Sequence, residues 1–286
     1  MDGQGAWLFR QAELVSAAVP VAILGASGRM GRTLLRCLPD FPALRLAGAL
    51  TAPGAGLGGR DAGEVAGLGP LGVALSEDVA AAVGAARVAV DFTLPEAVPA
   101  TAAACRAAGV ALVCGVTGLD ERARVALQEA ATTVPVLWAP NMSAGVAVLE
   151  RIAALAAAAL GDFDAGVIDV HHAAKRDAPS GTALALGRAV AAARGLGADA
   201  ATPADGLQAG ALGYAVLRSG DVVGEHTVVL AGAGERLELV HRATDRAIFA
   251  RGALRSAAWL AGKPPGMYTL AEVLGLGRVD TLAGGR

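Results

Sequence analysis

Six residues between positions 171 and 182 combine proton donors with the expected start of a helix. They are His171, His172 and Lys175, followed by Ser180, Gly181 and Thr182. The first turn of a helix presents unpaired backbone N–H groups and a partial positive charge, and these bind carboxylates or phosphates. The imidazole and ammonium groups add proton donors beside that cradle. The segment therefore predicts a reactive site for a small anionic substrate.

The same residues also have a purely structural explanation. Taken singly, Ser180 is a good helix N-cap, and His and Lys are common on protein surfaces. A metal site is not predicted for His171 and His172, because neighbouring residues of a strand point to opposite faces and no acidic or thiol partner has suitable spacing. His226 and His241 fall in alternating segments and are predicted to be structural or rim residues.

A glycine-rich turn near the start of the chain has the context of a dinucleotide-binding motif. Residues 19–24 form an apolar run typical of a buried strand, and a helical pattern begins at Arg32. Between them, Gly25, Gly28 and Gly31 follow the spacing G-x-x-G-x-x-G. Gly25 would permit the tight turn, Gly28 the close approach of a pyrophosphate, and Gly31 the packing of the helix on the strand. Strand, turn and helix in this order favour dinucleotide binding over a bare turn.

The end of the second predicted strand, residues 44–50, bears on the choice of coenzyme. A NAD-preferring fold usually places an acidic residue here to hold the ribose 2′-OH, whereas this chain has Thr51 and Ala52. The missing carboxylate removes a repulsion toward a 2′-phosphate. We therefore expect NADPH to be used at least as well as NADH, with Arg29 or Arg60 as candidates to contact the phosphate.

Helical and strand patterns alternate through the first half of the chain. Helices are predicted at 76–85, 95–108 and 120–131, strands at 87–93, 110–115 and 134–138, and a connecting loop at 55–72. Such alternation predicts a parallel sheet covered on both faces, with ligands bound beyond the carboxyl ends of its strands.

After a long predicted helix at 143–160 the pattern changes to successive strands with short turns. Strands are predicted at 166–172, 214–219, 225–230, 236–241 and 248–250, helices at 182–194, 253–261 and 269–274, and a loose stretch at 195–213. The fold class is therefore α/β: an N-terminal Rossmann-type doubly wound parallel sheet, followed by a C-terminal α+β domain with an open mixed or antiparallel sheet.

The composition excludes several classes of function. The 286 residues carry a net charge of −2 and only 3% aromatic residues, which argues against nucleic-acid partners. The longest uncharged run, 130–149, contains two prolines and does not predict a membrane span. Three cysteines without metal spacing are typical of buried thiols in a cytoplasmic protein. Residues 1–18 lack the pattern of a signal peptide and are expected to be a disordered extension.

The string His-His-x-x-Lys-x-Asp-Ala-Pro-Ser-Gly-Thr-Ala, from His171 to Ala183, resembles the signature of the dihydrodipicolinate reductase family. The glycine turn at 25–31 and the segment 59–64 are similar to the family as well, and the resemblance extends from about Val21 to Leu276. It implies NADPH- or NADH-dependent reduction of a cyclic imine with two carboxylates, in lysine and diaminopimelate biosynthesis. The resemblance also implies a homotetramer.

The resemblance assigns roles to individual residues. Hydride transfer would be followed by proton donation from His171, while Lys175 would hold a carboxylate or supply a second proton. His172, Lys175, Ser180, Gly181 and Thr182 would bind the substrate. The coenzyme would be contacted by the glycine turn and by consecutive strand ends: Gly25, Ala26, Ser27, Gly28, Arg29, Met30, Gly31, Thr51, Phe92, Thr93, Gly115, Val116, Thr117, Ala139, Pro140, Asn141 and Met142.

The resemblance also implies a domain plan. Residues 19–142 would bind the dinucleotide, 143–246 would bind substrate and form the oligomer, and 247–286 would return to the first domain. Two other readings stay open. One is a different two-domain NAD(P)-dependent dehydrogenase of amino-acid metabolism, which would not explain the string from His171 to Thr182. The other is a non-catalytic dinucleotide sensor, which would need no general acid beside an anion cradle.

Overall fold

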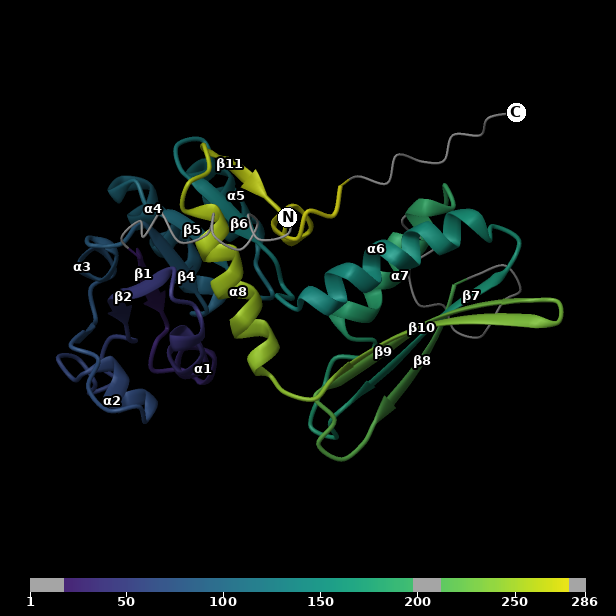
Figure 1. Cartoon of the computed structure of the whole chain (residues 1–286), viewed down its shortest axis with the longest axis horizontal. Coiled ribbons are helices and arrows are strands. Elements are labelled where there is room, and N and C mark those ends of the chain that lie inside the picture. The colour runs from purple at the N-terminus through teal and green to yellow at the C-terminus, as the bar shows by residue number, and fades with distance from the viewer. Residues whose placement is uncertain (1–17, 198–211, 278–286) are drawn as a thin grey trace, which may run out of the picture. The chain divides into compact units, whose positions relative to one another are not determined.

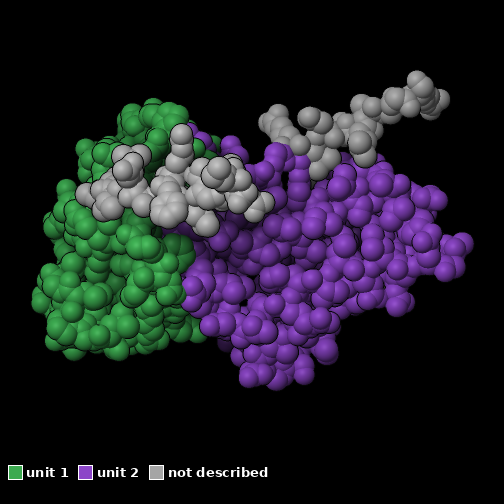
Figure 2. Space-filling view, viewed as in Figure 1, with its two compact units in different colours: residues 1–136, 257–267 green, residues 137–256, 268–286 purple. Residues whose placement is uncertain are grey.

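The computed structural model describes residues 18–197 and 212–277, and these form two compact units (Figures 1 and 2). The first unit comprises residues 1–136 and 257–267, and the second comprises 137–256 and 268–286. These boundaries lie several residues from those predicted after residues 142 and 246. Across the described ranges, no helix is long and apolar enough to cross a membrane.

The first unit is built on a seven-stranded sheet. Its strands are β1 (Val19–Leu24), β2 (Leu44–Leu50), β3 (Leu75–Ser76), β4 (Val88–Asp91), β5 (Ala111–Cys114), β6 (Pro135–Trp138) and β11 (Gly266–Tyr268). The order in the sheet is β11-β6-β5-β4-β1-β2-β3, and the strands from β5 to β3 run parallel to their neighbours. Apart from β11, this is the order of a Rossmann sheet, as predicted.

The helices of this unit alternate with the strands. They are α1 (Arg29–Cys37), α2 (Ala62–Ala66), α3 (Val79–Val83), α4 (Val98–Ala108) and α5 (Glu121–Ala131), with 3₁₀ turns η1 (Leu38–Asp40) and η2 (Pro95–Ala97). Every residue of β4 and β5 is buried. A parallel strand covered on both faces has no solvent side, which is why these segments are almost uniformly apolar.

The second unit contains a four-stranded mixed sheet with the order β10-β9-β7-β8. Its strands are β7 (Asp164–His171), β8 (Gly213–Arg218), β9 (Gly224–Gly232) and β10 (Glu235–Ala243), and its helices are α6 (Ala144–Ala159), α7 (Gly181–Ala193) and α9 (Leu270–Val273). Helix α8 (Ala247–Leu260) begins in this unit. β7 pairs in parallel with β8 and antiparallel with β9.

The core of the second unit lies between helices α6 and α7 and one face of this sheet. Leu149, Leu186, Val167 and Leu230 are among its buried side chains. Residues of β7 and β9 alternate between this core and the other face, so one face carries the hydrophobic contacts and the other stays open.

Two local predictions were wrong, and two short strands were not predicted. The predicted loop at 55–72 contains α2, because the Asp61 carboxylate accepts backbone hydrogen bonds from Gly63, Glu64, Leu71 and Gly72 and so caps the helix. The segment 248–250 is the first turn of α8 rather than a strand. The short strands β3 and β11 were not predicted. Residues 1–17, 198–211 and 278–286 lie outside the described residues, so the predicted extension and most of the loose stretch are not tested.

We predict that the native protein reacts slowly with a thiol reagent such as 5,5′-dithiobis(2-nitrobenzoate) at pH 8. All three cysteines are buried. Burial, with a smaller contribution from the charge of Asp91, raises the pKa of Cys105 to about 12 and also raises that of Cys114. Since the thiolate is the nucleophile, only about one Cys105 in 10⁴ is reactive at that pH. Unfolding in guanidinium chloride should release all three thiols. Rapid labelling of Cys105 or Cys114 in the native protein, located by mass spectrometry, would contradict the prediction.

Candidate active site

A fully buried carboxylate, Asp169 on β7, lies at the centre of the polar cluster in the second unit. Its Oδ2 accepts hydrogen bonds from the Ser180 backbone N–H at 2.8 Å and from Nη2 of Arg218 at 3.1 Å. Its Oδ1 accepts one from the Ser180 hydroxyl at 2.8 Å. Asp169 therefore ties strand β7 to strand β8 and to the beginning of helix α7.

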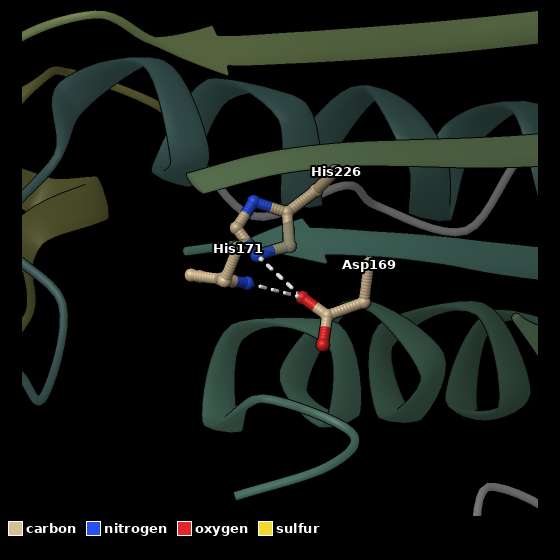
Figure 3. Close-up of side chains that lie close together, drawn as sticks. All are labelled: Asp169, His171 and His226. Atoms are coloured by element: carbon tan, nitrogen blue, oxygen red, sulfur yellow. Dashed lines mark ion pairs between the residues drawn. The ribbon is translucent and has the colours of Figure 1, made fainter. Parts of the chain in front are cut away.

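Two imidazoles approach the same carboxylate oxygen (Figure 3). Nδ1 of His171 lies 2.9 Å from Oδ1 of Asp169, and Nε2 of His226 lies 3.3 Å from it. The two rings meet edge to face with centroids 5.1 Å apart. Nε2 of His226 is also 3.3 Å from the Ser180 hydroxyl. We call Asp169, His171, Ser180, Arg218 and His226 the Asp169 cluster.

The surroundings keep Asp169 ionised. Burial acts to raise its pKa, but the close approach of His171 and His226 and the hydrogen bonds from Ser180 outweigh burial, and the pKa lies well below its ordinary value. The Arg218 guanidinium adds a compensating charge on the other carboxylate oxygen. A buried, ionised and fully paired carboxylate of this kind can orient its neighbours without changing its own protonation.

The loop between β7 and α7 carries Lys175. Nζ of Lys175 lies 2.8 Å from Oδ2 of Asp177, and Nη2 of Arg218 donates to the Asp177 carbonyl at 2.6 Å. Burial acts to raise the pKa of Asp177, but Lys175 and Arg218 outweigh it and the pKa is lowered. The lysine loop is thus held by the same arginine that holds Asp169.

The beginning of α7 carries the predicted anion cradle. Gly181 is exposed and Thr182 half-buried, and as first-turn residues their amides have no acceptor within the helix. Ser180 caps the helix by accepting from the Ala183 N–H at 3.1 Å. Ser180 was predicted to bind substrate, but its N–H and its hydroxyl both donate to Asp169. These polar groups of Ser180 are therefore already bound to Asp169, and Ser180 positions the start of the helix.

The segment 139–142 lies in the second unit and reaches this cradle. The Asn141 amide donates to the Thr182 hydroxyl at 2.9 Å, so a predicted coenzyme residue is in contact with a predicted substrate residue. Ala139 is half-buried, Pro140 exposed, and the Met142 side chain is buried in the core. His172 follows the last residue of β7 and is half-buried.

One of the two reasons given for excluding a metal, the lack of an acidic partner, was wrong. Asp169 is an acidic partner for His171, and with His226 these residues offer three ligand atoms within 4.8 Å of one another. The argument considered only adjacent residues, which alternate between the faces of a strand. It overlooked Asp169, which stands two residues before His171 and therefore shares its face. We assign no metal here, since the carboxylate is already paired with Arg218 and Ser180. The absence of a metal stays a prediction.

In the first unit, the turn after β1 has the geometry of a dinucleotide cradle. Gly25 has φ of +80°, and a Cβ there would lie 2.9 Å from the Phe92 carbonyl oxygen. A Cβ on Gly31 would lie 2.1 Å from the Gly25 carbonyl oxygen. Both glycines are therefore required by the backbone. Gly28 is the N-cap of α1 and offers no side-chain cap, which leaves the first-turn amides to a ligand such as a pyrophosphate.

The rest of the glycine turn is tied to the end of β2. The hydroxyls of Ser27 and Thr51 hydrogen bond at 2.8 Å, and Thr51 is 1% exposed. Ala26 is buried and its N–H donates to the Leu50 carbonyl. By contrast, Gly28 and Arg29 are exposed, and Met30 is half-buried. The exposed residues remain the candidates for direct coenzyme contact.

The strand ends of β4 and β5 lie next to this turn. Buried Asp91 accepts hydrogen bonds from the Thr93 hydroxyl at 2.6 Å and the Thr101 hydroxyl at 2.5 Å. Burial raises the pKa of Asp91, and the threonine hydrogen bonds act in the opposite direction. A Cβ on Gly115 would lie 2.3 Å from the Phe92 ring. Gly115 therefore leaves room for the predicted coenzyme residue Phe92. The next residue, Val116, is buried, whereas Thr117 is exposed.

Sequence reasoning missed three members of the Asp169 cluster. Asp169 stands two residues before His171, so strand periodicity could have placed it on the same face. Arg218 and His226 lie on other strands and come close only through the pairing of β7 with β8 and β9. The single-sequence pattern holds no signal for that pairing.

Comparison with known proteins agrees with this geometry. The family described as "Dihydrodipicolinate reductase, N-terminus" matches residues 19–142, and "Dihydrodipicolinate reductase, C-terminus" matches residues 145–274. The 4-hydroxy-tetrahydrodipicolinate reductase of Alkalilimnicola ehrlichii is 48% identical over 265 residues, covering 90% of this chain and 98% of that protein. The enzyme of the same name from Anaeromyxobacter dehalogenans is 49% identical over 268 residues, covering 90% and 97%.

Solved structures give the same fold. A dipicolinate-bound dihydrodipicolinate reductase from Paenisporosarcina sp. TG-14 has a TM-score of 0.71 at 22% identity, covering 89% of this chain and 98% of that one. A diaminopimelate dehydrogenase from C. glutamicum has a TM-score of 0.52 at 17% identity, covering 92% and 97%. Fold and site thus define a two-domain oxidoreductase with a Rossmann-type unit. More particularly, the chain belongs to the dihydrodipicolinate reductase family.

Two alanine substitutions in the glycine turn should separate folding from coenzyme binding. Gly31→Ala should lower the free energy of unfolding by about 1–3 kcal/mol, because its Cβ would meet backbone atoms that cannot move aside. The Cβ of Gly28→Ala would meet only the Gly25 carbonyl oxygen, at 3.2 Å. That variant should fold normally but bind NADPH about tenfold more weakly. Thermal denaturation and a fluorescence titration with NADPH measure the two effects. Equal stability of the two variants would contradict the assignment.

Proposed function

We propose that this protein reduces 4-hydroxy-tetrahydrodipicolinate to tetrahydrodipicolinate with NADPH or NADH, in lysine and diaminopimelate biosynthesis. In this conversion the substrate loses water and takes up a hydride and a proton. The main support is the segment from His171 to Thr182, which presents an imidazole, an ammonium group and a helix N-terminus on one connection fixed at Asp169. Relatives 48% and 49% identical carry the name of this activity.

The residues of that segment have complementary roles in the proposal. When bound, the reduced nicotinamide coenzyme supplies the hydride. His171 donates the proton, since an imidazole exchanges protons near neutral pH. Lys175 holds one carboxylate of the substrate, and the amides of Gly181 and Thr182 hold the other through the helix N-terminus. His172 contributes at the edge of this cradle, while Ser180 orients the helix entrance.

We propose that the coenzyme is held by residues 25–31 and by the strand ends at 51, 92–93, 115–117 and 139–142. NADPH is used at least as well as NADH, because the end of β2 carries no carboxylate at Thr51 or Ala52 that would repel a 2′-phosphate. The Thr51 hydroxyl is engaged with Ser27. The exposed side chains of Arg29 and Arg60 are the candidates for a phosphate contact.

We propose that 19–142 is the coenzyme domain, that 143–246 binds substrate and forms a homotetramer, and that 247–286 returns to the first domain. β11, which joins the first sheet, supports the return. The open face of the second sheet supports association, since Ile168, Leu217 and Val240 are 40%, 54% and 42% exposed there. We place the protein in the cytoplasm on the basis of its three buried thiols.

A different two-domain dehydrogenase of amino-acid metabolism would have the same fold, as the diaminopimelate dehydrogenase of C. glutamicum illustrates. It gives no role to the string from His171 to Thr182. A dinucleotide sensor would not need an imidazole held against a buried carboxylate. Consumption of NADPH with enzymatically generated 4-hydroxy-tetrahydrodipicolinate, and none with keto acids, separates the three possibilities.

Substitutions in the segment test the proposed roles. His171→Gln should lower kcat by about 10²–10⁴ with little change in coenzyme binding, because it removes the proton donor and leaves the first unit untouched. Lys175→Ala should lower kcat and raise the substrate KM, because it removes a carboxylate contact. Steady-state kinetics with a coenzyme titration measures both. Full activity of either variant would overturn the role assigned to that residue.

Coenzyme preference is tested by comparing kcat/KM for NADPH and NADH. The wild type should use NADPH at least as well as NADH. Ala52→Asp places a carboxylate at the end of β2 and should shift the ratio toward NADH by about tenfold or more. Ala55→Asp, at an exposed position of the following loop, is the matched control for added charge. A strong NADH preference in the wild type would contradict the proposal.

A further inference from the structure

We propose that Asp169 is a positioning residue for His171: the carboxylate holds Nδ1 of the imidazole, so that Nε2 is the nitrogen that handles the substrate proton. This inference rests on the proposed function, because it concerns the general acid of that reaction. Asp169 itself touches neither substrate nor coenzyme in the proposal. It acts only through His171.

The Asp169 carboxylate is rigidly held before either imidazole is considered. It is fully buried, and three donors from two other elements fix it: the Ser180 N–H, the Ser180 hydroxyl and the Arg218 guanidinium. Arg218 also donates to the backbone carbonyl of Asp169 at 3.3 Å. A carboxylate with both oxygens fixed in this way can select the orientation of a neighbouring ring.

His171 has one acceptor within reach of its inner nitrogen. Its Nδ1 is buried and lies 2.9 Å from Oδ1 of Asp169, but no aligned hydrogen bond to this nitrogen is found among the described residues. For this N–H to donate to the oxygen the ring has to turn, and catalytic hydrogen bonds often become aligned only when substrate binds. An N–H on Nδ1 leaves Nε2 of the neutral ring free to take up a proton, and the resulting imidazolium gives that proton from Nε2 to the substrate and returns to the neutral form.

The outer nitrogen of His171 faces a position without a side chain. A Cβ on Gly224 would lie 3.0 Å from Nε2 of His171. Glycine therefore leaves this nitrogen uncovered from the direction of strand β9. Nδ1 therefore faces the Asp169 carboxylate, whereas Nε2 faces Gly224, which has no side chain to cover it.

His226 shares the carboxylate but is placed differently. It is 4% exposed, and its Nε2 faces Asp169 and the Ser180 hydroxyl. That hydroxyl donates to Asp169 and can accept from His226, so His226 completes the support of the carboxylate. His171, which continues into the lysine loop, is the imidazole that Asp169 presents.

The first experiment determines which nitrogen of neutral His171 carries the proton, and it needs no substrate. Nitrogen-15 NMR of histidine-labelled wild-type protein should show neutral His171 with its proton on Nδ1, the signal being assigned by its loss in His171→Gln. Asp169→Asn replaces an acceptor oxygen with an N–H donor and should move the proton to Nε2. A wild-type ring protonated on Nε2 would overturn the proposal, even if Asp169→Asn failed to fold.

The second experiment measures whether Asp169 acts through His171. Asp169→Asn should lower kcat about 10²–10³-fold while the coenzyme KM stays within about twofold. When His171→Gln is already present, adding Asp169→Asn should lower kcat by less than about threefold more, because the imidazole that Asp169 positions is absent from both variants. Losses that multiply in the double variant would show an independent role for Asp169 and overturn the inference.

Asp164→Asn is the matched control. It makes the same change of charge at an exposed position of the same strand, and it should leave kcat within about twofold of the wild type. Circular dichroism and NADPH binding confirm that each variant is folded. If the wild type does not reduce the substrate at all, the proposed function fails, while the NMR result still decides the tautomer of His171.

Discussion

The attraction between one buried carboxylate and the donors around it organises the reactive half of this protein. Asp169 joins β7 to β8 through Arg218 and to α7 through Ser180. Without that charge, the guanidinium and two buried imidazoles would have no anionic partner in the cluster, and burying unpaired polar groups is costly. The position of the lysine loop and the entrance of α7 both follow from this constraint, because each is fixed at a residue that touches Asp169 or Arg218.

The proposed coenzyme site of the first unit is built from backbone rather than from charged side chains. Its predicted contacts depend on the absence of side chains, since the backbone at Gly25 and Gly31 leaves no room for a Cβ. The second unit depends on side chains that neutralise one another. A dinucleotide is common to many enzymes and can be held by backbone groups, whereas a particular small dianion needs charges placed individually.

The sequence permitted prediction of features whose cause is local. Strands β4 and β5 were recognisable because a doubly covered strand is apolar throughout, and the glycine turn because its spacing is fixed by backbone geometry. Features with distant causes were missed. Helix α2 depends on Asp61 accepting from amides in its first turn and from Leu71 and Gly72 beyond its end. Strand β11 depends on a strand far earlier in the chain, and the Asp169 cluster on the register of three strands.

The ion pair between Lys175 and Asp177 has a consequence for which anions the loop retains. In the proposed site, a substrate carboxylate that binds Lys175 replaces the Asp177 carboxylate. The free energy gained is therefore only the difference between two similar attractions. Because the Asp177 side of the pair is exposed to solvent, the pair is worth about 0–1 kcal/mol, and its exchange for a ligand carboxylate yields little by itself. A ligand with a second carboxylate adds a contact for which nothing has to be displaced. In the proposed function, the loop would therefore favour a dicarboxylate over a monocarboxylate.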